Sequence, residues 1–238
     1  MAAESDGDAY MRSFDSPSAS SGSLRISLAD SLSAAPRSRP QSSSTSAMGT
    51  PATIALPDWS TRLLNELDDN DLRARELVTP LNAEQLNWRS ADGTWSIGQC
   101  LEHLCATNDV YPSPILAALK GKPVAPVQEI KPGWFARWFI RSFIEPSAAT
   151  KRAKAPKKIV PGLRVELSVL ERFLSGNQVV REVIRRAAPH EVNRVRFKNP
   201  FIPILRFTVG TGLQIICSHQ RRHLLQAERV KASANFPA

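Results

Sequence analysis

Apolar side chains recur at helical spacing in four long stretches of this chain, and this pattern limits the possible folds more than any other feature. In the first stretch Trp59, Leu63 and Leu67 are four residues apart, which places them on one face of an α-helix. The four stretches cover about 58–78, 97–119, 163–188 and 207–230. No segment has a convincing strand pattern. The sequence therefore predicts an all-α protein with four helices of bundle length.

Prolines and capping residues set the expected ends of these helices. Pro80 and Pro189 end the first and third, because the residue before a proline avoids the helical conformation. Ser96 followed by Gln99 is a capping box that starts the second helix, and Pro112 must kink or break it. Residues 81–93 are expected to connect the first two helices, with packing anchors at Trp88 and Trp95.

Residues 1–55 differ in composition from the rest of the chain. Serine dominates between Ser16 and Ser46, and large apolar residues are scarce. Such a segment cannot bury enough apolar surface to offset the entropy lost on ordering, so we expect a disordered tail. Alternatively, translation starts at Met48, just before the helical pattern. The expected organisation is a tail over 1–55, a bundle over 56–232 and a short C-terminal tail over 233–238.

The formal net charge of +9 is unevenly distributed. Residues 51–119 carry −6, whereas 120–160 and 161–238 carry +8 each. This excess could attract an anionic substrate, an acidic surface or nucleic acid. Nucleic-acid binding is disfavoured, because no compact lysine and arginine run is interleaved with stacking aromatics.

The number and spacing of the cysteines indicate a reducing compartment, and the hydropathy argues against a membrane span. The three cysteines are odd in number and lack CxxC spacing, which argues against a disulfide framework. They are expected to be small buried apolar residues: Cys100, Cys105 and Cys217. No stretch approaches the roughly 18–20 apolar residues of a membrane span, and the N-terminus lacks a secretory signal pattern. We therefore expect a cytoplasmic protein without a membrane span.

A basic aromatic segment from Trp134 to Phe143 is a short helix candidate. One interpretation is a helix that lies on a membrane surface. Its length of about ten residues is short for independent interfacial binding, so we favour a flap that packs on the bundle.

Three of the four histidines lie at the margins of the predicted apolar stripes. His219 and His223 are four residues apart, so on a helix both rings project from one face and can bind one metal ion. His103, on the second helix, would complete a three-histidine site with open positions. We expect the three rings to meet at the end of a pocket between the second and fourth helices. Without metal they should resist protonation, because each added charge repels the others. The alternative is that these are hydrogen-bonded structural histidines.

The residues between and around the histidines restrict the reactions that such a site could catalyse. A zincin has a glutamate between its paired histidines, but here Gln220, Arg221 and Arg222 fill the gap, so the protease interpretation fails. Both arginines are expected to point away from the apolar stripe. Gln226 could orient a ligand or be structural. Candidate bases, suggested by proximity alone, are Glu102, Asp109 and Glu228.

Two stretches, Thr94-Trp-Ser-Ile-Gly-Gln-Cys-Leu-Glu-His-Leu and Ser218-His-Gln-Arg-Arg-His-Leu-Leu-Gln, with the irregular Asn199-Pro-Phe between them, resemble the DinB family, which includes YfiT-like proteins. In that family one histidine of the second helix and an HxxxH pair of the last helix bind a divalent metal. The resemblance implies that His103, His219 and His223 are the metal ligands. It also implies a DinB-like four-helix bundle with up-down-down-up topology, often a homodimer.

The function implied by this resemblance is metal-dependent chemistry on a small molecule. Better understood members use low-molecular-weight thiols such as bacillithiol or mycothiol, so we expect a thiol S-transferase or a hydrolase. The implied cofactors are a divalent metal (zinc, nickel or iron) and a low-molecular-weight thiol. The alternative is a non-catalytic metal-binding or dimerisation module of the stress-response type.

Overall fold

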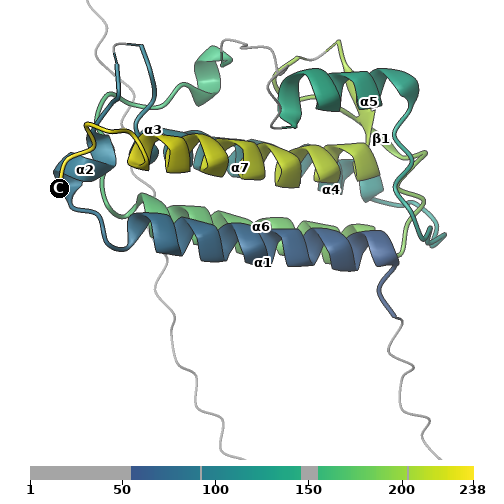
Figure 1. The fold of residues 1–238 in the computed structure, drawn as a ribbon. Helices are drawn as coiled ribbons and strands as arrows, with labels where there is room; N and C mark the ends of the chain where they lie inside the picture. Colours follow the sequence, from purple (N-terminus) through teal and green to yellow (C-terminus); the bar gives the residue numbers. More distant parts are fainter. Residues whose placement is uncertain (1–54, 92, 146–154, 203) are drawn as a thin grey trace, which may run out of the picture. The chain divides into compact units, whose positions relative to one another are not determined.

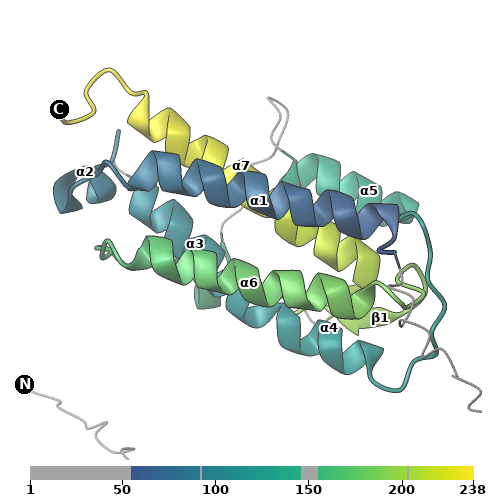
Figure 2. The same ribbon diagram turned by 90° about the horizontal axis from the view of Figure 1, so that it is seen from below.

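A computed structural model describes residues 55–91, 93–145, 155–202 and 204–238, and the expected N-terminal tail lies outside them, apart from its last residue. Four long helical segments lie side by side in these residues (Figures 1 and 2). α1 and α3 each pack against both α6 and α7, which agrees with the all-α prediction. The segments are α1 (Asp58–Val78), α3 (Ile97–Val110) with α4 (Pro112–Leu119), α6 (Val169–Ala187) and α7 (Val209–Lys231).

The expected start of α3 and its break are both confirmed. The Ser96 Oγ accepts a hydrogen bond from the Gln99 backbone N–H at 3.2 Å, and the Gln99 Oε1 accepts one from the Ser96 N–H at 3.1 Å. These are the two reciprocal bonds of a capping box. Pro112 then ends α3 and opens α4 at its first position, where the missing N–H is not needed.

The third long helix begins later than the apolar spacing predicted. Leu163 and Leu167 were expected on α6, but Leu163 is 85% exposed and α6 begins at Val169. The side chain of Asn87 exchanges two hydrogen bonds with the backbone of Val165, at 2.8 and 2.9 Å. This clamp holds the preceding segment outside the helix, and it comes from a residue that is distant in the sequence.

The connector between the first two helices contains a short helix, α2 (Ala83–Asn87), which the sequence prediction missed. The C-terminal residues, which were expected to form a tail, pack near it. Trp88 meets the Phe236 ring edge-on at 5.5 Å, and the Gln85 Nε2 donates to the Pro237 carbonyl at 3.2 Å.

The expectation of no strands was wrong for one small region. β1 (Arg196–Lys198) and β2 (Arg206–Thr208) pair antiparallel. Each strand has three residues and buries only its central phenylalanine, which is too little to show a period-two pattern in the sequence. Phe197 packs directly on α7, where a Cβ at Gly212 would lie 2.5 Å from its ring.

The basic aromatic segment forms a helical flap made of α5 (Trp134–Phe139) and one π-helical turn, η1 (Ile140–Ile144). Its inner face buries three apolar side chains in the bundle: Ala136, Ile140 and Ile144. The prediction of a flap packed on the bundle is confirmed. The other short element is a 3-10 turn, η2 (Lys157–Ile159). Within the described residues no helix is both long and apolar enough to cross a membrane.

The three cysteines are free and buried, as predicted. Desolvation raises the pKa of both Cys100 and Cys105 to about 12, so their thiols stay protonated at neutral pH. Burial likewise raises the pKa of Cys217. These side chains act as small apolar residues, not as nucleophiles.

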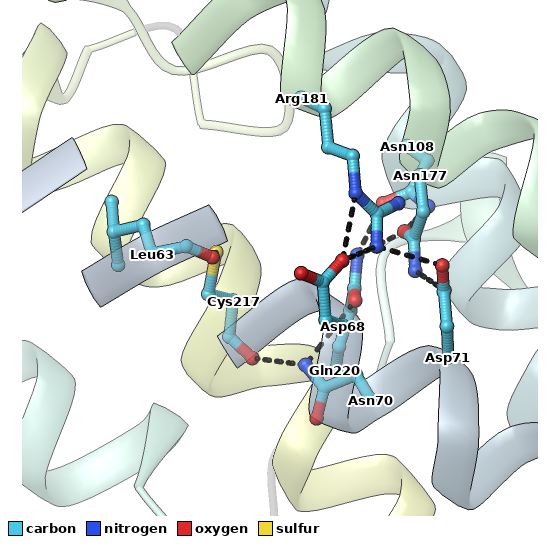
Figure 3. A network of polar contacts seen from close by, with 9 residues as sticks. All are labelled: Leu63, Asp68, Asn70, Asp71, Asn108, Asn177, Arg181, Cys217 and Gln220. Atoms are coloured by element: carbon cyan, nitrogen blue, oxygen red, sulfur yellow. Dashed lines mark hydrogen bonds and ion pairs between the residues drawn. The ribbon is translucent and has the colours of Figure 1, made fainter. Parts of the chain in front are cut away.

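Two apolar clusters fill the bundle, one around Trp59 and Leu213 and the other around Leu101 and Phe173. Between them lies a layer of polar side chains from all four helices, which we call the polar layer (Figure 3). Gln220 on α7 is 1% exposed and donates to the Oδ1 atoms of two asparagines on α3 and α6. The members of the layer are Asp68, Asn70, Asp71, Asn108, Asn177, Arg181 and Gln220.

Arg181 supplies the positive charge of this layer. Its NH2 group contacts the Asp68 Oδ1 at 2.6 Å and the Asp71 Oδ2 at 2.8 Å. Burial lowers the pKa of Arg181, but the two carboxylates outweigh this effect and raise it. Its buried NH1 atom has no hydrogen-bond partner among the residues that the structure describes. The layer fixes the lateral arrangement of the helices, because each buried polar group must meet its partners.

Candidate metal centre

The structure brings His103, His219 and His223, the triad, to one point between α3 and α7. One nitrogen from each ring lies within 4.8 Å of the other two. His219 and His223 occupy consecutive turns of α7, as their spacing predicts, and His103 faces them from the middle of α3. His103 is 3% exposed and His223 9%, whereas His219 is only partly buried.

The Nε2 atom of His219 lies at the spacing of metal ligands from the Nε2 atoms of both other rings. The His219 Nε2 lies 3.3 Å from the His103 Nε2 and 3.1 Å from the His223 Nε2. Two nitrogens bound tetrahedrally to zinc at about 2.0–2.1 Å are roughly 3.3 Å apart. Both separations therefore match pairs of ligands in a tetrahedral centre, and one nitrogen of each ring lies within 4.8 Å of the other two.

The opposite ring nitrogens are committed to oxygen acceptors. The His103 Nδ1 lies 2.7 Å from the Ile159 carbonyl, which can only accept, so this Nδ1 carries the proton. The His223 Nδ1 lies 3.0 Å from the Gln226 Oε1 in the same way. Neutral rings with Nδ1–H present the lone pair at Nε2, as metal-binding histidines do. Two such lone pairs face the His219 Nε2, which can donate to only one of them, so a divalent cation fits this donor set.

Trp95 forms a wall beside the triad. Its ring centroid lies 4.8 Å from that of His103 and 5.6 Å from that of His223, and the planes of Trp95 and His223 are inclined by 30°. The sequence predicted only a packing anchor at this position. The indole limits the motion of two rings and excludes water from their side of the site.

Burial disfavours protonation throughout the triad. Desolvation is the largest cause for each ring, and it lowers the pKa of His223 to about 3 and that of His219 well below 6.5. The neighbouring imidazoles and Arg222 act in the same direction on both. Burial also lowers the pKa of His103, against the effect of its hydrogen bond to Ile159. The expectation that clustered imidazoles resist protonation agrees in direction, but mutual repulsion is secondary to burial.

Arg222 lies closer to the triad than expected. The sequence pattern pointed both arginines away from the apolar stripe, and Arg221 does pair with Glu66 on α1, at 2.8 Å. The charge of Arg222, in contrast, contributes to the lowered pKa of His219 and His223. Its NH1 group donates a hydrogen bond to the Phe143 carbonyl of the flap. Arg222 therefore places a half-buried cation between the triad and the flap.

A scan against protein-family models matches residues 66–227 to the model described as DinB superfamily. The chain belongs to the DinB superfamily. No curated protein and no solved structure gives a significant match. The matched residues include the whole triad, and metal binding is a property of this family.

In this DinB protein the three carboxylates that the sequence suggested as bases either have other partners or are exposed. The Glu102 Oε2 accepts from the Gly162 N–H at 2.7 Å, and Glu228 pairs with Arg73 at 2.7 Å. Asp109 is exposed. Among the described residues, no carboxylate contributes to the lowered pKa values of the triad.

An open depression lies away from the triad, over α1 and α7. Its lining includes no triad residue: Asp58, Thr61, Arg62, Asn65, Glu66, Asp69 and Arg221. We do not connect it with the metal centre. The expectation that the triad stands at the end of a pocket remains a prediction.

Sequence reasoning found the triad but missed three of its neighbours. Trp95 directly precedes the N-cap Ser96 of α3, and an aromatic residue at this position could have been noticed. The Ile159 carbonyl carries no sequence signal, because any residue supplies a backbone oxygen. The helical spacing gave no signal that Arg222 would lie near enough to act on His219 and His223.

Proposed function

We propose that this DinB protein is a metal-dependent enzyme of the thiol S-transferase or hydrolase type. Its triad would bind a divalent ion (zinc, nickel or iron) through three Nε2 atoms. The observation that carries the proposal is the convergence of these atoms at 3.1 and 3.3 Å, with two Nδ1 groups held by oxygen acceptors. A structural histidine needs only a hydrogen-bond partner, not a shared point with two others.

The chain's own residues would set the charge and orientation of this site. Three neutral imidazoles leave the full charge of a bound divalent ion, which supplies Lewis acidity that lowers the pKa of a thiol or water. Ile159 and Gln226 hold protons at the Nδ1 atoms of His103 and His223. Trp95 keeps bulk water from one side of both rings.

Arg222 is the residue that we expect to bind an anionic group of the substrate. It is the cation whose charge acts on both His219 and His223. Burial lowers its pKa below the usual value of an arginine, yet a guanidinium stays protonated near neutral pH. A carboxylate on a low-molecular-weight thiol is a suitable partner, since guanidinium and carboxylate form paired hydrogen bonds.

The first experiment measures metal and turnover together. Protein purified without an immobilised-metal column is analysed for bound metal, then assayed with several thiols and an electrophile such as chlorodinitrobenzene. We expect near-stoichiometric metal and thiol-dependent turnover. His103→Ala should lower metal affinity by at least about tenfold. Loss of a residue that only orients a metal ligand typically lowers metal affinity about 10- to 100-fold, and this variant loses one of the three ligands themselves.

The matched control is His190→Ala. His190 is the fourth histidine, lies outside the triad and contacts the Pro123 carbonyl at 3.0 Å. It should retain metal and activity. His219→Ala guards against a folding artefact, because His219 is the most exposed member of the triad. Turnover that is equal in wild type and both triad variants, across the metals and thiols, would exclude the enzyme.

A second candidate is a non-catalytic metal-binding or dimerisation module of the stress-response type. It is favoured by the positions of the three carboxylates suggested as bases, since Glu102 bonds to Gly162, Glu228 pairs with Arg73 and Asp109 is exposed. This candidate predicts bound metal without turnover, and lower thermal stability after chelation.

The remaining parts of the proposal follow the family resemblance. We infer an up-down-down-up bundle, and the course of the colours along α1, α3, α6 and α7 in Figures 1 and 2 supports it. We also infer a homodimer in the cytoplasm that acts on a small molecule. The domain proposal is a bundle over 56–232 between tails at 1–55 and 233–238.

A further inference from the structure

The outer face of the flap exposes large aromatic side chains. Trp134 is 77% exposed, Trp138 48% and Phe135 37%, although the opposite face of the same segment is buried. The rings of Trp134 and Phe135 are 6.0 Å apart, and those of Phe135 and Trp138 are 5.7 Å apart. The three rings thus form one continuous patch, which we call the aromatic patch. Contiguous exposed apolar surface of this kind marks a contact site, whereas isolated exposed residues do not.

Basic residues accompany the aromatic patch. Arg137 and Arg141 are exposed and lie one helical turn apart on the flap, next to the two tryptophans. Residues 131–144 contain three basic residues and no acidic residue. Glu145 follows at the end of the flap, where its charge helps to raise the pKa of Glu66 on α1 after the larger effect of burial. The patch itself is therefore surrounded by positive charge.

The small sheet next to the flap extends this positive surface. The Phe139 and Phe207 rings lie 5.4 Å apart and join the two, and Figures 1 and 2 show α5 and β1 at the same end of the bundle. Residues 192–208 hold four basic residues and no acidic residue. All four side chains are exposed: Arg194, Arg196, Lys198 and Arg206. The turn of the hairpin also exposes Ile204, at 88%.

We propose that this end of the bundle, the aromatic patch with its neighbouring basic side chains, docks on an anionic lipid bilayer. Tryptophan and phenylalanine rings gain free energy at the boundary between headgroups and acyl chains, while arginine and lysine attract anionic headgroups. The flap is short for binding by itself, but it is held against the bundle by Ala136, Ile140 and Ile144. A pre-formed helix loses less conformational entropy on binding than a free peptide.

The positive charge around the aromatic patch argues against a second copy of this chain as its binding partner. A two-fold interface brings the same patch of both copies together. The two segments supply seven basic residues and no acidic partner, so each copy would meet like charges. A nucleic acid has the negative charge that would attract the basic side chains, but it offers no apolar region for the exposed apolar side chains. Base stacking uses aromatic faces and gains nothing from an exposed aliphatic residue such as Ile204.

The test uses the full chain and two kinds of vesicle, phosphatidylcholine alone and phosphatidylcholine with about one third phosphatidylglycerol. Sedimentation should show binding to the anionic vesicles, weakened by added salt because salt screens exposed charges. Trp134→Ser with Trp138→Ser should lower partitioning at least about tenfold and remove the blue shift of tryptophan emission. Arg137→Gln with Arg141→Gln should lower it about 30-fold, at about 1 kcal/mol per charge.

Two matched control variants distinguish binding through the aromatic patch from nonspecific adsorption to vesicles. Leu163→Ser removes an apolar side chain that is 85% exposed elsewhere, and Arg75→Gln with Arg229→Gln removes two exposed charges from α1 and α7. Both should leave vesicle binding unchanged. Unfolding midpoints of all variants should match wild type, because the substituted side chains are exposed.

Several outcomes would overturn the proposal. These are no vesicle binding, equal binding to phosphatidylcholine alone, or a tryptophan variant that binds like wild type. Sedimentation equilibrium that shows a dimer dissociated by Trp134→Ser with Trp138→Ser would identify the patch as a self-association face. Retention of a single-stranded oligonucleotide without vesicle binding would assign it to nucleic acid. None of these results depends on metal or turnover, so they test docking separately from the proposed enzyme.

Discussion

His223 shows how strongly the surroundings of one residue set its protonation. Burial lowers its pKa to about 3, with smaller contributions from His103 and Arg222, while the Gln226 side chain opposes them. In an unfolded chain a histidine titrates near 6.5. The folded protein therefore keeps this ring neutral, which is the form that binds metal.

The first prediction concerns stability against pH in metal-free protein. Because the folded pKa of His223 lies below the unfolded value, the unfolded state takes up the proton first as pH falls. The free energy of unfolding should be unaffected above about pH 7 and should fall from about 6.5 downwards. Between pH 7 and pH 4 this one residue accounts for a loss of about 3 kcal/mol.

Urea unfolding of wild type and His223→Asn at both pH values measures this loss. The variant lacks the titrating ring, so it should lose about 3 kcal/mol less than wild type between pH 7 and pH 4. His190→Asn, which alters the histidine outside the triad, should lose as much as wild type. Equal losses in wild type and His223→Asn would show that the ring is not held neutral by burial.

Helix α7 depends on the polar layer for its rotation about its own axis. Gln220 lies directly after His219 and donates to Asn108 on α3 at 3.0 Å and to Asn177 on α6 at 2.8 Å. When Gln220 lies in the polar layer, the helical spacing of α7 directs His219 and His223 toward α3. Gly176 allows the close approach of α6, since a Cβ there would lie 3.2 Å from the Asn108 side chain.

Gln220→Leu should disturb stability and metal affinity together. The substitution leaves the Asn108 Oδ1 without its donor, and a buried group that loses its partner costs about 1–3 kcal/mol. Chemical denaturation should show this loss, and metal titration should show weaker binding because α7 is less firmly held. Gln214→Leu, on the same helix at a partly exposed site, is the control. A Gln220→Leu protein with wild-type stability and affinity would remove the positioning role.

At the scale of the whole molecule, a bound metal would stabilise the bundle by joining helices that are distant in sequence. His103 and His219 are separated by 116 positions, so an unfolded chain rarely presents all three ligands together. A ligand that binds only the folded state at 100 times its Kd adds about 2.7 kcal/mol. For a chain of this size that corresponds to a Tm rise of about 5–10 °C.

Calorimetry with and without metal tests this stabilisation. Wild-type protein should show the rise in Tm, and a chelator should reverse it. His219→Ala should show little or no rise, whereas His190→Ala should match wild type. A wild-type Tm that does not respond to zinc, nickel or iron would argue against a metal centre of either the catalytic or the non-catalytic kind.

The sequence by itself determined the helical character of the chain, most helix ends and the identity of the triad. These features depend on local chemistry: apolar spacing, the Ser96 capping box, the prolines and the four-residue step between His219 and His223. The buried state of the cysteines also followed from residue type. His103 was joined to the other two histidines by its place at the margin of its own apolar stripe and by the family resemblance, because spacing alone cannot link residues on separate helices.

Only the tertiary structure decided the features that depend on contacts between distant residues. The late start of α6 follows from the clamp between Asn87 and Val165, and the small sheet is too short to leave a pattern in the sequence. The positions of Trp95 and Arg222 beside the triad depend on the packing of whole helices. Periodicity specifies which face of a helix is apolar, but the partner that covers the face, and the charge beside it, are set by how all four helices pack together.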